Sequence, residues 1–241
     1  MEAVRTERSL AKIRVPSICV LDFDGDLADG LLREGEATFS ESWACFHTQM
    51  LVTKVGDVEC GVIPRTIGGP YAVLIAEQLH AAGARLTIGL TSAGRIAPAL
   101  PLPSMVVVDE AVRDEGTSLH YLPSSGTIQT PSPLLVEYLV QHLAGVSPVR
   151  RGLVWTTDAP YRETAQQLLT WGDRGALAVE MQAASLFAFG EARGAMVAMV
   201  ALVNNSVVGE HKAFDTGGHS YRVKLLTAIV SAGHQLLSRM R

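Results

Sequence analysis

The chain has 241 residues, a formal net charge of −4 and a pI near 6.0. Nucleic-acid-binding domains usually carry a basic footprint, so this balance excludes nucleic acid as an expected partner. Hydrophobic residues make up 48% of the chain and charged residues only 18%, below the roughly 25% usual for soluble domains. The composition therefore favours one large core and a surface that is partly buried between subunits.

The three cysteines, Cys19, Cys45 and Cys60, are far apart and form no CxxC pair, so we expect reduced thiols and a cytoplasmic protein. The N-terminal segment has no apolar signal core, and no stretch approaches about 18 uninterrupted apolar residues, so we expect no contact with a membrane. We expect residues 1–14 to be an N-terminal extension and residues 15–241 to form a single domain.

A mostly apolar run at residues 15–23 predicts a buried strand, which ends at the acidic turn Asp24-Gly25-Asp26. Further strands are expected at residues 42–48, 49–55 and 58–63, the last two joined by a Gly56-Asp57 turn. Two glycines and a proline then open a helix at residues 71–82. Another strand at residues 85–90 ends in the small hydroxylated residues Thr91 and Ser92.

The second half of the chain repeats this alternation of strands and helices. Strands are predicted at residues 105–109 and 152–156, a helix between them at 132–144, and a final helix at 221–240. The segment 177–205 reads as a strand, a polar patch, a helix and a second strand at 195–203. A glycine-bearing loop at residues 206–220 is a candidate lid. Polar residues repeatedly follow strands, which is where ligands bind in open α/β sheets.

Four segments together resemble the nucleoside phosphorylase superfamily, in family order and over most of residues 15–237. They are IGGP at 67–70, VRDEGTSLHY at 112–121, TTDAPYRET at 156–164 and VEMQAA at 179–184. The resemblance implies a three-layer α/β/α sandwich with a central mixed, partly barrel-like sheet. It also implies a homodimer or homohexamer that cleaves the glycosidic bond of a nucleoside without a metal or other cofactor, with phosphate as a possible co-substrate.

The resemblance assigns roles to individual residues. Glu180, Gln182 and Asn205 stand at catalytic positions. The expected substrate-binding residues are Met181 on the sugar, Ser92 and Gly25 on the nucleophile side, and Thr157, Tyr161, Arg162 and Glu163 on the base side. The base-side segment has an alternative reading as a capped helix start, with Thr157 or Asp158 as the N-cap.

Several positions depart from the family pattern. Gln182 replaces a glutamate that binds ribose hydroxyls, and Asn205 replaces an aspartate or arginine. On the phosphate side, Asp29 and Gly89 stand near positions where the phosphorylases carry arginines. An acid repels an anion, so we expect a degenerate phosphate site unless a neighbouring arginine compensates; the candidates are Arg33, Arg65 and Arg95.

These departures leave alternatives open. The protein is either a phosphorylase-like enzyme, a nucleosidase that uses water, or a member redirected to a different reaction in a specialised biosynthetic pathway. A binding protein without catalysis is a further reading. The Asp22-x-Asp24-Gly25 sequence also resembles the first motif of haloacid-dehalogenase-type phosphatases, which use magnesium, although Asp26 stands where that motif has threonine.

Overall fold

The computed structural model describes residues 14–43, 45, 47–124, 126–206 and 218–240. The expected N-terminal extension and most of the expected lid lie outside these residues. The described strands are β1 (Ile18–Asp22), β2 (Ala37–Phe39), β3 (Leu51–Val55), β4 (Val58–Pro64), β5 (Leu86–Arg95), β6 (Ser104–Asp114), β7 (Thr127–Gln129), β8 (Val149–Thr157), β9 (Ala178–Glu180) and β10 (Met196–Ser206).

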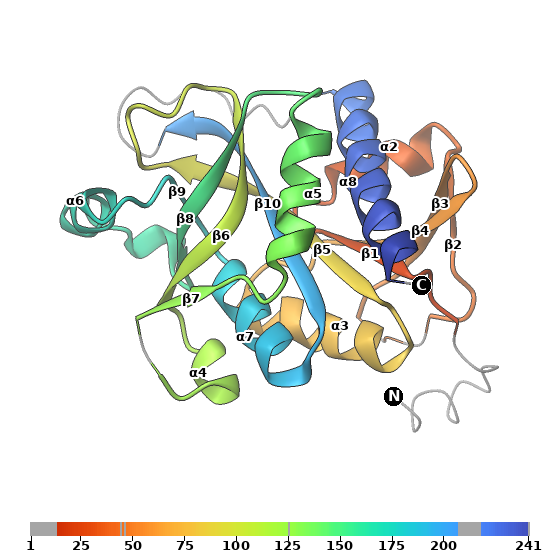
Figure 1. The fold of residues 1–241 in the computed structure, drawn as a ribbon, viewed down its shortest axis with the longest axis horizontal. Coiled ribbons are helices and arrows are strands. Elements are labelled where there is room, and N and C mark those ends of the chain that lie inside the picture. The colour runs from red at the N-terminus through yellow and green to blue at the C-terminus, as the bar shows by residue number, and fades with distance from the viewer. Residues whose placement is uncertain (1–13, 44, 46, 125, 207–217, 241) are drawn as a thin grey trace.

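All ten strands belong to one mixed sheet, in the order β10-β6-β8-β9-β5-β1-β4-β3-β2, with β7 beside β6. Strand β10 also pairs with β5, in parallel over most of its length. Strands β5, β10, β6, β8 and β9 therefore form a closed ring, and β1, β4, β3 and β2 extend from it as an open sheet (Figure 1). The sheet is partly barrel-like, as predicted.

Helices cover both faces of the open sheet. The described helices are α2 (Asp26–Arg33), α3 (Gly69–Ala81), α4 (Ser118–Tyr121), α5 (Pro133–Leu143), α6 (Ala165–Asp173), α7 (Ala183–Arg193) and α8 (His219–Arg239), with a 3-10 turn at Pro160–Arg162. Helices α3 and α7 pack on one face, and α2, α5 and α8 pack on the other (Figure 1).

Strand β1 shows why the protein has three layers. Its side chains alternate, because successive residues of a strand point to opposite faces. Cys19 and Leu21 belong to the core under α3 and α7, whereas Ile18 and Val20 belong to the core under α5 and α8. The predicted fold, a three-layer α/β/α sandwich in a single domain, is confirmed.

Several sequence-based boundaries were wrong. Residues 42–48 form no strand where they are described, although Trp43 and Cys45 are buried in the core. Strands β5 and β6 run past their predicted ends, so Thr91 and Ser92 lie within β5. Apolar runs mark the buried centre of a strand, whereas pairing with neighbours decides where the strand ends.

Helix α2 was missed because its sequence, DLADGLLR, reads as a continued acidic turn. Its stability comes from packing: Leu27 and Leu31 are buried against the sheet. Gly30 allows α8 to approach, since a Cβ atom there would lie 2.3 Å from Nδ1 of His219. Glycine is unfavourable in a helix by about 1 kcal/mol relative to alanine, so tertiary contacts stabilise this helix.

Parallel pairing brings the carboxyl ends of β1, β4, β5 and β10 to one edge of the sheet. Asp22 is aligned with Pro64 of β4 and Leu90 of β5, and Leu90 is aligned with Val200 of β10. Strand β9 joins this edge through Val179, which pairs with Gly94. The segments that follow these strands carry most of the polar residues singled out in the sequence.

Gly89, in the middle of β5, provides a test of this packing. A Cβ atom at Gly89 would lie 2.1 Å from Sδ of Met199 and 2.8 Å from Cε2 of Phe23, both of which are buried. Overpacking a core typically costs about 1–3 kcal/mol. We expect Gly89→Ala to lower the free energy of unfolding by this amount, measured by urea denaturation.

The matched control is Gly145→Ala. Gly145 has open space around the position of a Cβ atom and no left-handed backbone conformation, so its free energy of unfolding should change by less than about 0.5 kcal/mol. Equal effects of the two substitutions would contradict the packing around Gly89.

Candidate active site

The turn after β1 is held against β5 by the carboxylate of Asp24. Its Oδ2 accepts a hydrogen bond from the backbone N–H of Ser92, at 3.0 Å, and a second one from the Ser92 hydroxyl. Gly25 follows in a left-handed conformation, with φ of 88°, and caps helix α2. The two residues predicted on the nucleophile side, Ser92 and Gly25, therefore lie together, joined by Asp24.

Two arginines neutralise part of this acidic turn. The side chain of Arg65 packs over Gly25, where a Cβ atom would lie 2.9 Å from its Cγ, and its guanidinium forms an ion pair with Asp29. Arg222, from α8, is buried and donates from Nη2 to Asp26 at 3.0 Å. Nε and Nη1 of Arg222 are buried without a hydrogen-bond partner.

Burial dominates the titration of the two aspartates nearest the sheet. It raises the pKa of Asp22 to about 6 and also raises the pKa of Asp24. The positive charge of Arg222 and the hydrogen bonds to each carboxylate act in the opposite direction. Arg222 therefore helps to keep both groups ionised near neutral pH.

Of the three arginines considered as replacements on the phosphate side, Arg65 alone packs against Gly25. Arg33 pairs with its neighbour Glu34 at the far end of α2. Arg95 donates to the carbonyl of Leu100 at 3.2 Å. Arg65 is already paired with Asp29, so its charge is compensated within the protein.

Glu180 lies at the end of β9, and both of its carboxylate oxygens are used within the protein. Oε1 accepts from the hydroxyl of Thr156 at 2.5 Å, and Oε2 accepts from the backbone N–H groups of Gln182 and Ala183 at 2.6 and 2.9 Å. The carboxylate thus satisfies N–H groups at the start of α7 that have no partner within the helix. Only 4% of Glu180 is exposed.

Gln182 is also buried, with 2% of its surface exposed. In the amide orientation that satisfies both atoms, its nitrogen donates to Oε2 of Glu180 at 3.1 Å and to Oγ1 of Thr91 at 3.3 Å. Its oxygen accepts from the N–H of Gly68 at 3.1 Å. Gln182 therefore connects the glycine turn before α3 with β5 and β9.

Two predicted site residues at this edge of the sheet are partly exposed. Met181 is half-buried in the turn between Glu180 and Gln182, and Asn205 is half-buried near the end of β10. Oδ1 of Asn205 is itself buried and has no hydrogen-bond partner in the described part of the chain. Such an unsatisfied acceptor is unusual and requires an explanation.

The predicted base-side loop separates into buried and exposed parts. Thr157 is buried, and its hydroxyl accepts from the N–H of Ala159 at 3.3 Å. Tyr161 is 100% exposed and Arg162 is also exposed. Glu163 is half-buried, and burial raises its pKa. Of the four predicted residues of this loop, Tyr161 and Arg162 form no side-chain hydrogen bond or ion pair with any described residue.

The alternative reading of this loop as a helix cap is wrong in its details. Helix α6 is capped by Thr164, whose hydroxyl accepts from the N–H of Gln167 while the Gln167 side chain bonds back, a complete capping box. Asp158 instead accepts from the N–H of Gly116 at 2.9 Å. It therefore holds the loop after β8 against the turn before α4.

Sequence reasoning did not identify Thr156 and Thr91, which bond to Glu180 and Gln182. It also did not identify Arg222, which bonds to Asp26. Thr156 and Thr91 are small hydroxylated residues near strand ends, a weak signal by itself. Arg222 stands in an otherwise amphipathic helix pattern about 200 residues from Asp22. No local pattern shows that α8 packs beside α2.

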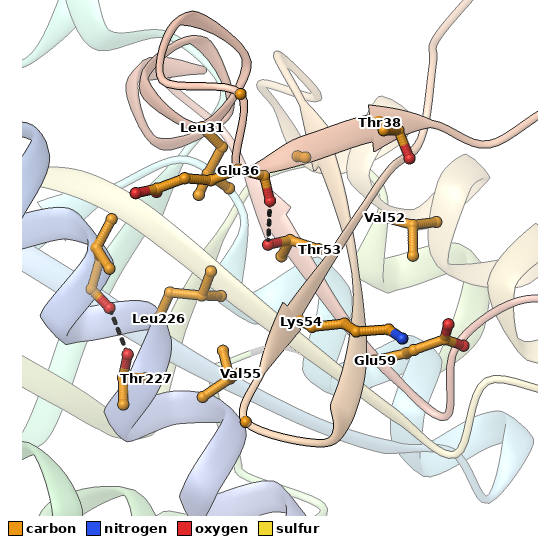
Figure 2. A pocket seen from close by; sticks show the side chains of 14 residues that line it. Leu31, Glu36, Thr38, Val52, Thr53, Lys54, Val55, Glu59, Leu226 and Thr227 are labelled. Carbon is orange, nitrogen blue, oxygen red and sulfur yellow. Dashed lines mark hydrogen bonds between the residues drawn. The ribbon is translucent and has the colours of Figure 1, made fainter.

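A cavity of about 750 Å³ lies away from this cluster, between α8 and the β2–β3 hairpin (Figure 2). It is lined by polar side chains such as Glu36, Thr53 and Lys54 and by apolar ones such as Leu226, and by none of the predicted site residues. Within the described residues, no group of three or more His, Cys, Asp or Glu side chains is placed to hold a metal ion.

The fold and the polar edge define a protein of the nucleoside phosphorylase type, and comparisons agree. Residues 17–231 match the sequence model of the family described as "Phosphorylase superfamily". The chain belongs to the phosphorylase superfamily.

Individual relatives are more distant. A guanosine phosphorylase of Halorubrum lacusprofundi is 27% identical over 62% of this chain and 63% of its own length. A uridine phosphorylase of Treponema pallidum is 28% identical over 68% and 69%. A mimivirus protein, R802, is 31% identical over 53% and 49%. The chain thus covers less than two thirds of the length of the guanosine phosphorylase and of the mimivirus protein. No described helix has the length and apolar character needed to span a membrane.

The buried Glu180 predicts a specific pH dependence of stability. Burial raises its pKa from 4.5 to about 7, despite the opposing hydrogen bonds from Thr156, Gln182 and Ala183. Between these pH values the folded state keeps a proton that the unfolded chain releases, so this group's contribution falls as pH rises. We expect the free energy of unfolding to fall less steeply between pH 4.5 and pH 7 in Glu180→Gln than in the wild type.

The measurement is urea denaturation of both proteins at several pH values. The wild type is itself the control for the remaining groups: Asp22, whose pKa is about 6, titrates in both proteins, so its contribution cancels in the difference. Identical pH slopes would show that Glu180 does not titrate in this range.

Proposed function

We propose that this protein cleaves the glycosidic bond of a nucleoside or a closely related glycoside at the edge formed by β1, β5, β9 and β10. The observation that carries the proposal is the β9–α7 turn, which leaves Met181 half-buried between two side chains fixed inside the protein. Membership of the phosphorylase superfamily supports the proposal, as do relatives named guanosine phosphorylase and uridine phosphorylase.

The chemistry needs a sugar held in place while positive charge develops on it and the base departs. Fixed dipoles and charges that do not reorganise are effective in such a step. In this proposal, Glu180 and Gln182 hold the turn, and Met181 contacts the sugar. The acidic groups Asp22 and Asp24 lie on the side from which the nucleophile attacks, where negative charge favours an oxocarbenium-like sugar.

The base side is proposed to use Asn205, Thr157 and Glu163. Asn205 supplies the unsatisfied Oδ1 acceptor, which suits an N–H group of a base. An amide cannot protonate a leaving group, so we propose that Asn205 orients the base and does not act as a general acid. Arg162 and Tyr161 are exposed in the monomer and would join the site only through a neighbouring subunit or a movement of their loop.

The phosphate side is proposed to be degenerate. Arg65 is compensated by Asp29, and Gly89 offers no space for a side chain. Inorganic phosphate should therefore bind weakly, and the reaction should not depend on it strictly.

The direct test measures release of free base from a panel of purine and pyrimidine nucleosides, with and without phosphate. We expect turnover of at least one nucleoside by the wild type, with kcat/KM reduced about 10-fold in Asn205→Ala. A factor of ten corresponds to about 1.4 kcal/mol, within the usual cost of losing a buried hydrogen bond. The matched control is Gln141→Ala, which removes an exposed amide on α5. Binding of nucleosides without any turnover would favour the non-catalytic reading.

We also propose a homodimer or homohexamer. Large apolar side chains are exposed on or next to α3 and α4, including Ile67, Leu74 and Leu119, and Leu74 lines one pocket together with His120 and Tyr121. Contiguous exposed apolar surface commonly marks a subunit contact. Sedimentation at micromolar concentration should give a mass well above the 25.7 kDa of one chain, and a strictly monomeric mass would contradict the proposal.

A further inference from the structure

The contact between Asp24 and Ser92 joins two groups that would otherwise be available to a bound anion. The backbone N–H and the hydroxyl of Ser92 both donate to Oδ2 of Asp24. Helix N-termini attract anions, and the helix that follows this turn, α2, is capped by Gly25; in its first turn the N–H of Ala28 donates to Oδ2 of Asp22 at 2.9 Å. The position suited to an anion is thus occupied by a carboxylate of the chain itself.

We infer that Asp24 takes the place of phosphate in this site and activates a water molecule, so that the glycosidic bond is hydrolysed. This inference rests on the proposed cleavage of a glycosidic bond, and it names the nucleophile and the residue that activates it.

The surrounding charges oppose a bound phosphate. Asp22, Asp26 and Asp29 lie in the same short segment as Asp24; the negative charge of Asp24 acts on Asp22, and that of Asp26 acts on Asp24. Of their two cationic neighbours, Arg65 is paired with Asp29, and Arg222 donates through Nη2 to Asp26. Like charges at short distance repel strongly in a partly buried site. Water carries no charge and avoids this repulsion.

The position of Asp24 suits a general base. One oxygen is fixed by Ser92, whereas no described residue donates a hydrogen bond to the other, Oδ1, and the side chain is half-buried. Burial raises the pKa of Asp24, which makes the carboxylate a stronger base than an exposed one. Arg222 lowers the same pKa, and so maintains the ionised form that accepts a proton.

Arg222 also supports a negative charge at this site. It is 1% exposed, its positive charge acts on Asp22 and Asp24, and Nε and Nη1 have no partner among the described residues. A buried cation with free donors beside an acidic turn stabilises negative charge there. We assign it as a positioning residue that acts through the aspartates.

In the proposed step, water attacks the sugar and the base leaves. The oxygen of water forms a bond to the anomeric carbon while the bond from that carbon to the base nitrogen breaks. Oδ1 of Asp24 accepts one proton of the water, and the base departs with the bonding electron pair. The base then takes up a proton from solvent, and Asp24 returns its proton to solvent. The products are the free sugar and the neutral base.

The first experiment uses the full chain, a nucleoside that the wild type cleaves, and phosphate-free buffer prepared in ¹⁸O-labelled water. We expect base release with one labelled oxygen in the sugar. Asp24→Asn should reduce the rate at least about 100-fold, since general-base catalysis contributes roughly 10² to 10⁴. The matched control Asp57→Asn removes the same charge from the exposed β3–β4 turn and should retain the wild-type rate.

The second experiment tests occupancy without relying on turnover. Inorganic phosphate is titrated against the wild type and Asp24→Ala, and the unfolding temperature is followed. We expect phosphate to stabilise Asp24→Ala, in which the Ser92 donors are free, and to leave the wild type unchanged.

The possible outcomes separate the two proposals. Strict phosphate dependence with formation of sugar 1-phosphate overturns the inference and leaves glycosidic cleavage intact. Hydrolysis at the wild-type rate by a folded Asp24→Asn overturns the role of Asp24 alone. Equal stabilisation of the wild type and Asp24→Ala by phosphate overturns the occupancy. No base release from any nucleoside overturns the proposed function and the proposed role of Asp24 as the base together.

Discussion

The buried carboxylate of Glu180 is the constraint on which this edge of the molecule depends. It ties β8 to β9 through Thr156 and satisfies the first N–H groups of α7. A second bond, from the N–H of Ala184 to the Thr156 hydroxyl, fixes the helix start from the other side. With these donors paired, the β9–α7 turn has one geometry, and Met181 is presented at a defined position.

The polar edge has two parts with different physical character. On the side proposed to hold the sugar, Glu180 and Gln182 are held by internal hydrogen bonds. On the β1–β5 side, the turn carries several acidic side chains, and Asp24 accepts hydrogen bonds from the N–H and the hydroxyl of Ser92. A rigid turn next to a negative one suits the proposed cleavage, in which positive charge develops on the sugar.

Local patterns predicted much of the fold correctly. The glycine-proline turn before α3, the apolar stripe of α8 and the order strand, helix, strand at β9, α7 and β10 are all present. These elements bury one apolar face each, so their periodicity is visible in the sequence. Helix α2, with Gly30 in its centre, has a poor intrinsic signal and depends on His219 and the sheet. Of the predicted site residues, Glu180 and Gln182 are hydrogen-bonded to each other, and Ser92 is bonded to Asp24 beside Gly25, whereas Tyr161 and Arg162 are exposed.

The sequence by itself determined the fold class, through the four segments that resemble the family, and most of the elements, because strand alternation and turn glycines are local properties. It also determined that Gln182, Asn205, Gly89 and Asp29 differ from the residues of the family. Only the tertiary structure decided how those differences are accommodated: that Gln182 is enclosed by Glu180, Thr91 and Gly68, and that Asp24 engages Ser92. Hydrogen bonds and charges act over a few ångströms in space, and residues 24 and 92, or 26 and 222, become neighbours only when the sheet and its covering helices are assembled.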